Sequence, residues 1–226
     1  MARGLFITGT GTGVGKTYVG ALIAKALREA GKRVGVYKPV ASGCELRDDK
    51  LISPDAVALW EAAGRPGTLE QVCPQLFAAP LAPHLAARDE GRRVDPRLLR
   101  EGIEFWRGAS DVVIVEGAGG LMSPISDDDY NANLIAEFKY PLLVVSANEL
   151  GTINHTLLTL IAARSYLDDG LNTAGVVLNS PRPTADDPSV ESNAAQLALH
   201  CGTPLLATVT HSGGFERPVD WWMLAK

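Results

Sequence analysis

The stretch that decides the fold is Gly9-Thr10-Gly11-Thr12-Gly13-Val14-Gly15-Lys16-Thr17, which follows the apolar run Leu5-Phe6-Ile7-Thr8 and opens an alanine-rich segment. A glycine-rich turn between a strand and a helix lets successive backbone N–H groups converge on phosphate oxygens, and the helix N-terminus adds partial positive charge. In such a loop the lysine reaches the terminal phosphates and the next hydroxyl reaches Mg²⁺. The stretch predicts a P-loop that binds ATP through Gly13, Val14, Gly15, Lys16 and Thr17.

Two other interpretations of these glycines are weaker. A purely structural turn would not need the Gly-Lys-Thr ending or the flanking strand and helix. A dinucleotide-binding turn needs a G-x-G-x-x-G register, and none occurs here. The usual P-loop spacing would place a glycine at Thr10, whereas this chain has Gly9 one residue earlier, so the loop is a variant of the motif.

Length and composition favour one globular domain covering residues 1–226. The chain has 46% hydrophobic and 21% charged residues and a net charge of −5, without a basic run. These values argue against nucleic acid or an anionic membrane surface as partner and favour small molecules. The cysteines at 44, 73 and 201 form no CxxC and are expected to be free thiols. With a strand beginning by about Leu5 and no long apolar segment, a cytoplasmic enzyme is expected.

Short β-rich runs alternate with helical patterns along the chain, which predicts a three-layer α/β fold with a mostly parallel sheet between helices. The expected strands are Leu5–Thr8, Val34–Lys38, Val112–Glu116, Leu142–Ser146, Gly175–Leu178 and Leu205–Val209. The expected helices are Thr17–Ala30, one starting at Ser53-Pro54-Asp55, Arg97–Arg107 and Ile153–Leu167, the last with Ile153, Leu157, Leu160, Ile161 and Leu167 on one face. Ser180–Ser189, with three prolines, is expected to be a loop.

Two charged residues are expected beside the P-loop, because ligands bind at the carboxyl ends of the strands in open α/β sheets. Glu116 ends an apolar strand, and a carboxylate there supplies a hard oxygen ligand for Mg²⁺. The alternative is a solvated or helix-capping carboxylate. Lys38 also ends a strand, and the proline after it keeps the backbone extended so that the ammonium can project over the site. The alternative is an ordinary surface lysine.

Several motifs together resemble the dethiobiotin synthetase family over residues 4 to about 179. The loop is similar to the family form GTxTxVGKT, and Lys38-Pro39-Val40-Ala41-Ser42-Gly43 is similar to its Lys-Pro-Val-x-Ser/Thr-Gly motif. The remaining matches are Ser53-Pro54-Asp55, Glu116-Gly117-Ala118-Gly119-Gly120 and Leu150-Gly151-Thr152-Ile153-Asn154-His155. No single piece is diagnostic, but the combination is highly specific.

The resemblance implies an ATP- and Mg²⁺-dependent conversion of 7,8-diaminononanoate and CO₂ into dethiobiotin, ADP and phosphate in biotin biosynthesis. A carbamate forms on one amine, takes the γ-phosphoryl group, and is closed into a ring by the second amine. Lys16 and Lys38 are then the catalytic pair, while Thr17, Asp55 and Glu116 hold the metal. Before the resemblance is counted, Asp55 could also be a first-turn aspartate favoured by the helix dipole.

The resemblance also assigns binding roles. Thr12, Lys38 and Ser42 contact the substrate, and Gly151, Thr152, Ile153 and Asn154 hold its far carboxylate across a homodimer interface. Gly117, Ala118 and Gly119 approach the nucleotide through their backbone, and Asn179, Ser180, Thr210, His211 and Ser212 surround the base. His155 is interpreted as structural.

The sequence departs from the family at Gly13, where many members have glutamate, at Ser180, where aspartate is frequent, and at Val209-Thr210-His211-Ser212, where an Ile/Val-Pro segment is usual. Related classes fit less well. A cobyrinate-synthase-like ligase usually carries a further glutaminase domain, for which the chain lacks length. A partition-type switch ATPase would have a lysine at the position of Gly11.

Overall fold

The computed structural model describes residues 2–183 and 186–226, and its centre is a six-stranded parallel sheet. The spatial order is β2-β5-β1-β6-β7-β8, and all five neighbouring pairs run parallel. The strands are β1 (Arg3–Gly9), β2 (Val34–Tyr37), β5 (Val112–Gly120), β6 (Leu142–Ala147), β7 (Thr173–Asn179) and β8 (Leu205–Val209). The predicted parallel sheet and all six expected strands are therefore confirmed.

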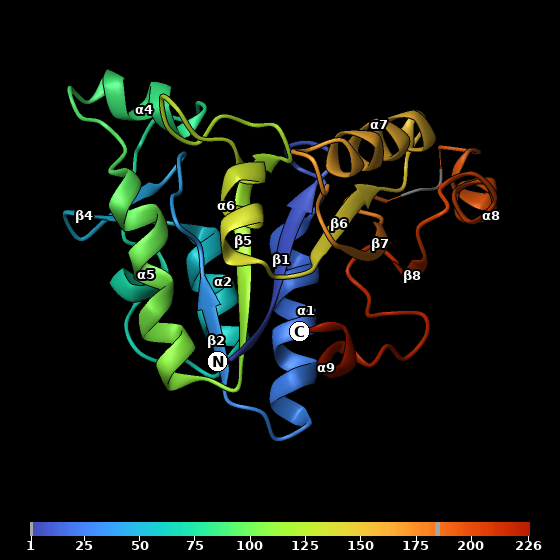
Figure 1. Cartoon of the computed structure of the whole chain (residues 1–226), viewed down its shortest axis with the longest axis horizontal. Coiled ribbons are helices and arrows are strands. Elements are labelled where there is room, and N and C mark those ends of the chain that lie inside the picture. The colour runs from blue at the N-terminus through green and yellow to red at the C-terminus, as the bar shows by residue number, and fades with distance from the viewer. Residues whose placement is uncertain (1, 184–185) are drawn as a thin grey trace.

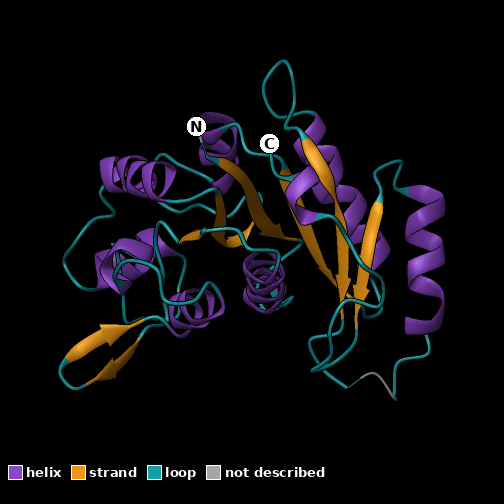
Figure 2. Ribbon diagram, turned by 90° about the horizontal axis from the view of Figure 1, so that it is seen from below, coloured by secondary structure: helices purple, strands orange, loops and turns teal. Residues whose placement is uncertain are grey.

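Helices cover both faces of this sheet (Figures 1 and 2). The structure contains α1 (Lys16–Glu29), α2 (Pro54–Ala62), α3 (Leu69–Val72), α4 (Pro83–Asp89), α5 (Pro96–Ala109), α6 (Asn131–Phe138), α7 (Thr152–Arg164), α8 (Val190–His200) and α9 (Trp221–Leu224). In Figure 1, α4 and α5 lie on the side of β2, whereas α7 and α8 lie on the side of β6 to β8. A separate hairpin, β3 (Glu45–Arg47) and β4 (Lys50–Ile52), projects from the body (Figure 2).

Local sequence signals explain where the helices next to the site begin. The Ser53 hydroxyl accepts a hydrogen bond from the Ala56 N–H at 3.2 Å, and Pro54 occupies the first turn, so α2 starts directly beside Asp55. Asp95 caps α5 in the same way through the Arg97 N–H at 2.8 Å. Gly15 precedes α1 with φ of 87°, a left-handed conformation that glycine adopts without steric cost.

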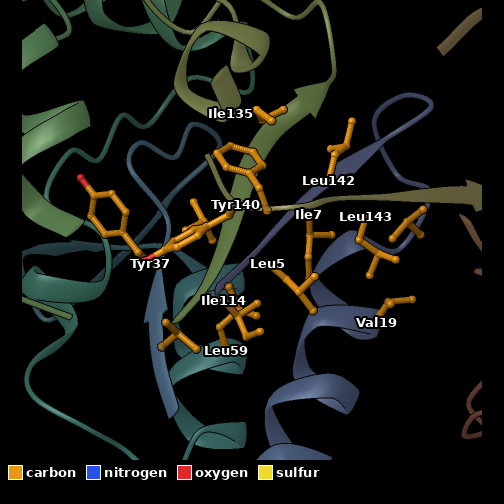
Figure 3. Packing of buried hydrophobic residues seen from close by; sticks show 14 of the residues in the cluster. Leu5, Ile7, Val19, Tyr37, Leu59, Ile114, Ile135, Tyr140, Leu142 and Leu143 are labelled. Carbon is orange, nitrogen blue, oxygen red and sulfur yellow. The ribbon is translucent and has the colours of Figure 1, made fainter. Parts of the chain in front are cut away.

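The core lies on both faces of the strands, as the labelled side chains in Figure 3 show. Leu5, Ile7 and Ile114 from the central strands are fully buried, and Val19 of α1 and Leu59 of α2 pack with them. Fully burying side chains of this size is worth about 1.5–3 kcal/mol each. Packing of this kind fixes the ends of β1, β2 and β5, from which the site is built.

The segment after β8 folds back along that edge strand. The Glu216 N–H donates to the Thr208 carbonyl at 3.0 Å, and Phe215 forms an antiparallel bridge with Val209. The Arg217 side chain donates to the Leu206 carbonyl at 2.6 Å and also to the Leu205 carbonyl. The outer side of β8 is thus partly occupied by the chain itself.

The prediction for the helix after β6 was partly wrong. α7 ends at Arg164, and Leu167 lies beyond it in a left-handed conformation with φ of 56° and 70% exposure. Ile161 is 56% exposed, because the face that packs inward consists of Thr152, Thr156, Leu160 and Ala163. Hydroxyl side chains bonded to one another can be buried as readily as apolar ones, and a count of apolar residues misses them.

Other regions were not anticipated or are only partly described. The β3–β4 hairpin and the helices α3, α4, α6, α8 and α9 were not predicted from the sequence. In the loop 180–189, residues 184 and 185 lie outside the described residues, and the remaining positions carry no strand or helix. None of the described helices has the length and hydropathy that a membrane span requires.

Candidate active site

A cavity of about 840 Å³ lies where the P-loop, the residues after β2 and the end of β5 meet. Ten of the residues predicted to bind ligands line it: Thr12, Gly13, Gly15, Lys16, Thr17, Lys38, Ser42, Asp55, Ala118 and Gly119. The opposite wall is formed by Pro80, Leu81, Ala82 and Pro83. The topology thus brings together residues that are more than a hundred positions apart in the chain.

The P-loop lysine lies inside its own loop. Lys16 is 8% exposed, and its ammonium donates to the Gly11 carbonyl at 3.1 Å. Burial lowers the pKa of Lys16, and the nearby Glu116 only partly offsets this effect. A triphosphate in the cavity would supply anionic partners for this lysine.

The second lysine is the centre of a buried ionic cluster. The Lys38 ammonium lies 3.0 Å from Asp55 Oδ2 and forms an ion pair with Glu116 Oε1. The Thr17 hydroxyl donates to the same Glu116 oxygen at 3.0 Å. Lys38 is 3% exposed and Glu116 is fully buried, so neither a surface lysine nor a solvated carboxylate describes them. These alternatives are excluded.

Two pKa shifts follow from this cluster. Burial alone would lower the pKa of Lys38, but the ion pairs with Glu116 and Asp55 outweigh it, and the net pKa is raised. Burial would raise the pKa of Asp55, whereas its contact with Lys38 lowers it below the ordinary range. The side chains of Lys38 and Asp55 are therefore both charged at neutral pH.

The donor set fits a magnesium ion. Asp55 and Glu116 contact the Lys38 ammonium and the Thr17 hydroxyl contacts Glu116, so three hard oxygen donors gather here, and such oxygens are the ligands that Mg²⁺ prefers. Glu116 Oε2 is buried and has no hydrogen-bond partner within the described residues. Buried polar atoms rarely stay unpaired, so this oxygen is available to a cation or its water. No group of three or more His, Cys, Asp or Glu side chains suited to a metal occurs in the described part of the chain.

The glycine segment at the end of β5 is shaped by one buried amide. The Asn131 side chain donates to the carbonyls of Ala118 and Gly120, both at 2.7 Å. A Cβ atom at Gly117 would lie 2.5 Å from Asn131 Oδ1, which leaves room only for glycine. Ala118 and Gly119 then face the cavity. Asn131 was missed at the sequence level, because an asparagine in the first turn of a helix carries no signal for such a role.

Asn179 holds the P-loop from the other side. Its side-chain amide donates to the Val14 carbonyl at 2.9 Å, and Asn179 itself is 1% exposed. Its Oδ1 atom is buried without a partner among the described residues. A Cβ atom at Gly15 would lie 2.1 Å from Asn179 Nδ2, so this contact requires glycine. Ser180 follows it and is also buried.

The remaining predicted residues do not line this cavity. Gly151, Thr152, Ile153 and Asn154 start α7, where the Thr152 hydroxyl is 2.7 Å from that of Ser146. Thr210, His211 and Ser212 follow β8, and the neighbouring Gly213 carbonyl accepts a hydrogen bond from the Tyr18 hydroxyl at 2.7 Å. Tyr18 lines the cavity and was not predicted. The roles of the residues at 151–154 and 210–212, like those of the residues that line the cavity, remain predictions.

The chain resembles solved P-loop proteins. It aligns with the septum site-determining protein MinD from Pyrococcus horikoshii, determined with Mg-ADP, with a TM-score of 0.54 and 21% identity over 93% of this chain and 82% of that one. A ParA family ATPase from Chlorobium tepidum gives a TM-score of 0.56 and 16% identity over 93% and 84%. At these identities the likeness shows the fold. The fold is that of P-loop NTPases, and a family model described as an AAA domain matches residues 3–218.

Sequence relatives narrow this class. The chain is 48% identical to the ATP-dependent dethiobiotin synthetase BioD of Rhodopirellula baltica, over 95% of this chain and 86% of that protein. Proteins of the same name from Anaeromyxobacter dehalogenans (45%, over 87% and 84%) and Bacillus licheniformis (39%, over 90% and 84%) are also similar. The chain therefore belongs to the ATP-dependent dethiobiotin synthetase family, whose members are ligases of biotin biosynthesis, and the resemblance seen in its motifs is confirmed.

Proposed function

We propose that this enzyme converts 7,8-diaminononanoate, CO₂ and ATP into dethiobiotin, ADP and phosphate with the help of Mg²⁺. The observation that carries the proposal is that Lys16, Lys38 and Asp55 line a single cavity, with the buried Glu116 paired to Lys38 behind its wall. That cavity is also lined by the P-loop. The names of the relatives support the same reaction.

The two lysines act on anionic oxygens. A carbamate on the diamine, the γ-phosphoryl group and the released phosphate all concentrate negative charge at one place during the reaction. Lys16 is held by burial and by the Gly11 carbonyl, and Lys38 by its ion pairs, so both ammonium groups are kept close to the place where this charge develops. Mg²⁺ would be held by Thr17, Asp55 and Glu116, and when bound it would neutralise phosphate oxygens as in other phosphoryl transfers.

Substrate binding is assigned to Thr12, Lys38 and Ser42 on the cavity wall. The Ser42 hydroxyl donates to the Leu81 carbonyl at 2.6 Å, so its oxygen can still accept a hydrogen bond from an amine. The start of α7 would bind the substrate carboxylate through its free N–H groups. Because Gly151–Asn154 do not line the cavity of their own chain, we assign this contact to the second subunit of a homodimer. The exposed apolar side chains of Leu150, Leu158 and Ile161 support an interface there.

Recognition of the base is assigned to Asn179, Ser180, Thr210, His211 and Ser212. The unpaired Oδ1 atom of Asn179 is a suitable acceptor for the amino group of adenine. Tyr18 ties the 210–214 segment to the start of α1, which keeps it near the P-loop. The free, buried thiols are consistent with a cytoplasmic enzyme.

The direct test supplies the protein with ATP, Mg²⁺, bicarbonate and 7,8-diaminononanoate. Mass spectrometry should detect the cyclic urea, and ADP should form in equal amount. Lys38→Ala should lower turnover by ~10²-fold or more, whereas Lys25→Ala, on the surface of α1 in an exposed pair with Glu29, should leave it unchanged. ATP hydrolysis that does not depend on the diamine, without a urea product, would contradict the proposal.

A further inference from the structure

We propose that the Lys38 ammonium occupies the cation position that Asp55 and Glu116 would offer to a divalent metal. With the metal bound, Lys38 would give up these contacts and turn toward the cavity, so metal binding and delivery of the lysine would be one event. This inference rests on the metal site in the proposed function. It adds that the site is filled by a side chain of the protein before the metal arrives.

The first argument is geometric. The Lys38 ammonium bridges the two carboxylates, at 3.0 Å from Asp55 Oδ2 and in contact with Glu116 Oε1. A magnesium ion held by Asp55 and Glu116 would draw on the same carboxylate oxygens that the ammonium now contacts. Lys38 and Glu116 are almost completely buried, so water cannot enter between the two carboxylates and make room for the metal ion and the ammonium together.

The second argument is the charge of the cluster. Asp55 and Glu116 together carry two negative charges, and Lys38 is the only cation that the described residues place in an ion pair with them. A buried carboxylate without a partner is costly, so a nucleotide-free protein needs such a cation. A divalent ion and an ammonium at this point would repel each other strongly, because in a partly buried site even two unit charges 4 Å apart interact by about 4 kcal/mol.

The third argument concerns where the ammonium can go. Lys38 also lines the cavity, and the P-loop faces it there. Lys16 does not compete for the same place, since its ammonium donates to the Gly11 carbonyl at 3.1 Å. A displaced Lys38 therefore finds its new partners among the anionic oxygens of nucleotide and substrate.

The test measures metal binding without nucleotide, with Mn²⁺ as the probe and its EPR signal as the readout. Wild type should bind Mn²⁺ weakly, because Lys38 must first be displaced. Lys38→Met should bind it at least ~10-fold more tightly than Lys16→Met does, since each variant removes one positive charge from the same cavity but only Lys38 occupies the position. Adding Glu116→Gln to Lys38→Met should abolish the gain, which assigns it to this site. Equal affinities of the two lysine variants would overturn the inference.

Lys38→Met leaves Glu116 without a counter-ion, which costs stability. Mn²⁺ should therefore raise the melting temperature of this variant more than that of wild type, because a ligand that binds only the folded state stabilises it. If the variant does not fold, Lys38→Gln, which keeps a hydrogen-bond donor without charge, is compared with Lys16→Gln by the same criteria. No ATP or diamine is present in these titrations, so a missing urea product and a missing gain in Mn²⁺ affinity are separate results.

Discussion

The contact between Gly117 and Asn131 gives a prediction that can be tested by a double-mutant cycle. Asn131 is 1% exposed and donates two hydrogen bonds of 2.7 Å that hold the end of β5. A methyl group at Gly117 would lie 2.5 Å from Asn131 Oδ1 and 2.8 Å from Asn131 Cγ. Gly117→Ala therefore has to displace the asparagine and break the same two bonds that Asn131→Ala removes.

The magnitudes follow from this shared mechanism. A typical intramolecular hydrogen bond contributes about 1 kcal/mol, so each single variant should lose about 2 kcal/mol of unfolding free energy. In the Asn131→Ala background the clash is absent. Gly117→Ala should then lower the unfolding free energy by less than ~0.5 kcal/mol. The new methyl group still lies close to Phe6, which is unfavourable, but alanine also reduces the conformational freedom of the unfolded chain, which offsets this loss. The interaction energy of the pair is thus about −2 kcal/mol.

Urea unfolding of the wild type, the two single variants and the double variant measures this energy, provided that the m-values agree. Both single variants should also raise KM for ATP, since Ala118 and Gly119 line the cavity. Additive losses, with the double variant about 4 kcal/mol less stable than wild type, would show that Asn131 does not hold the strand end as described.

Three further predictions concern other residues. Thr17→Val should weaken Mg²⁺-dependent nucleotide binding in calorimetric titrations, and an unchanged dependence on Mg²⁺ would show that the hydroxyl is not a ligand. Arg100 lies 2.7 Å from Asp129, and its hydrogen bonds hold the pKa of that carboxyl below the ordinary range. Asp129→Asn should therefore lower the unfolding free energy by about 1 kcal/mol at pH 7, and the loss should shrink as the pH falls through the lowered pKa of the wild-type carboxyl. Burial raises the pKa of Cys73 to about 12, and all three cysteines are buried, so a disulfide reagent at pH 8 should label them only after unfolding; rapid labelling of native protein would contradict this.

The central part of the fold could be predicted because its signals are local. Each buried strand is a short run of β-branched and apolar residues. Helices α2 and α5 each begin with a cap residue followed by proline, which is a recognisable sequence signal. The lysines and carboxylates of the site could also be predicted, since parallel strands deliver the residues at their carboxyl ends to one edge. Lys38 and Glu116 lie where this rule puts them, whereas Lys16 was expected from the P-loop motif and Asp55, in the first turn of α2, from the family resemblance.

Other parts depend on contacts that no local pattern encodes. α7 packs inward through Thr152 and Thr156, whose hydroxyls lie 2.7 and 2.8 Å from Ser146 Oγ. These hydrogen bonds between hydroxyls of α7 and β6 decide which face of α7 is buried. The spacing of hydrophobic residues cannot predict them. Tyr18 likewise reaches a carbonyl almost two hundred residues away. The hairpin β3–β4 has exposed or half-buried residues throughout, so it lacks the apolar alternation that marks a strand.

The segment that folds back over β8 restricts how copies of this chain can meet. An uncovered outer strand offers a row of N–H and C=O groups that another chain can extend into a larger sheet. Here the Arg217 guanidinium and the Phe215–Glu216 backbone take up part of that row themselves. Subunits that associate beside β8 must therefore do so through side chains rather than by joining their sheets. Aggregation into fibres by strand addition at this edge is disfavoured for the same reason.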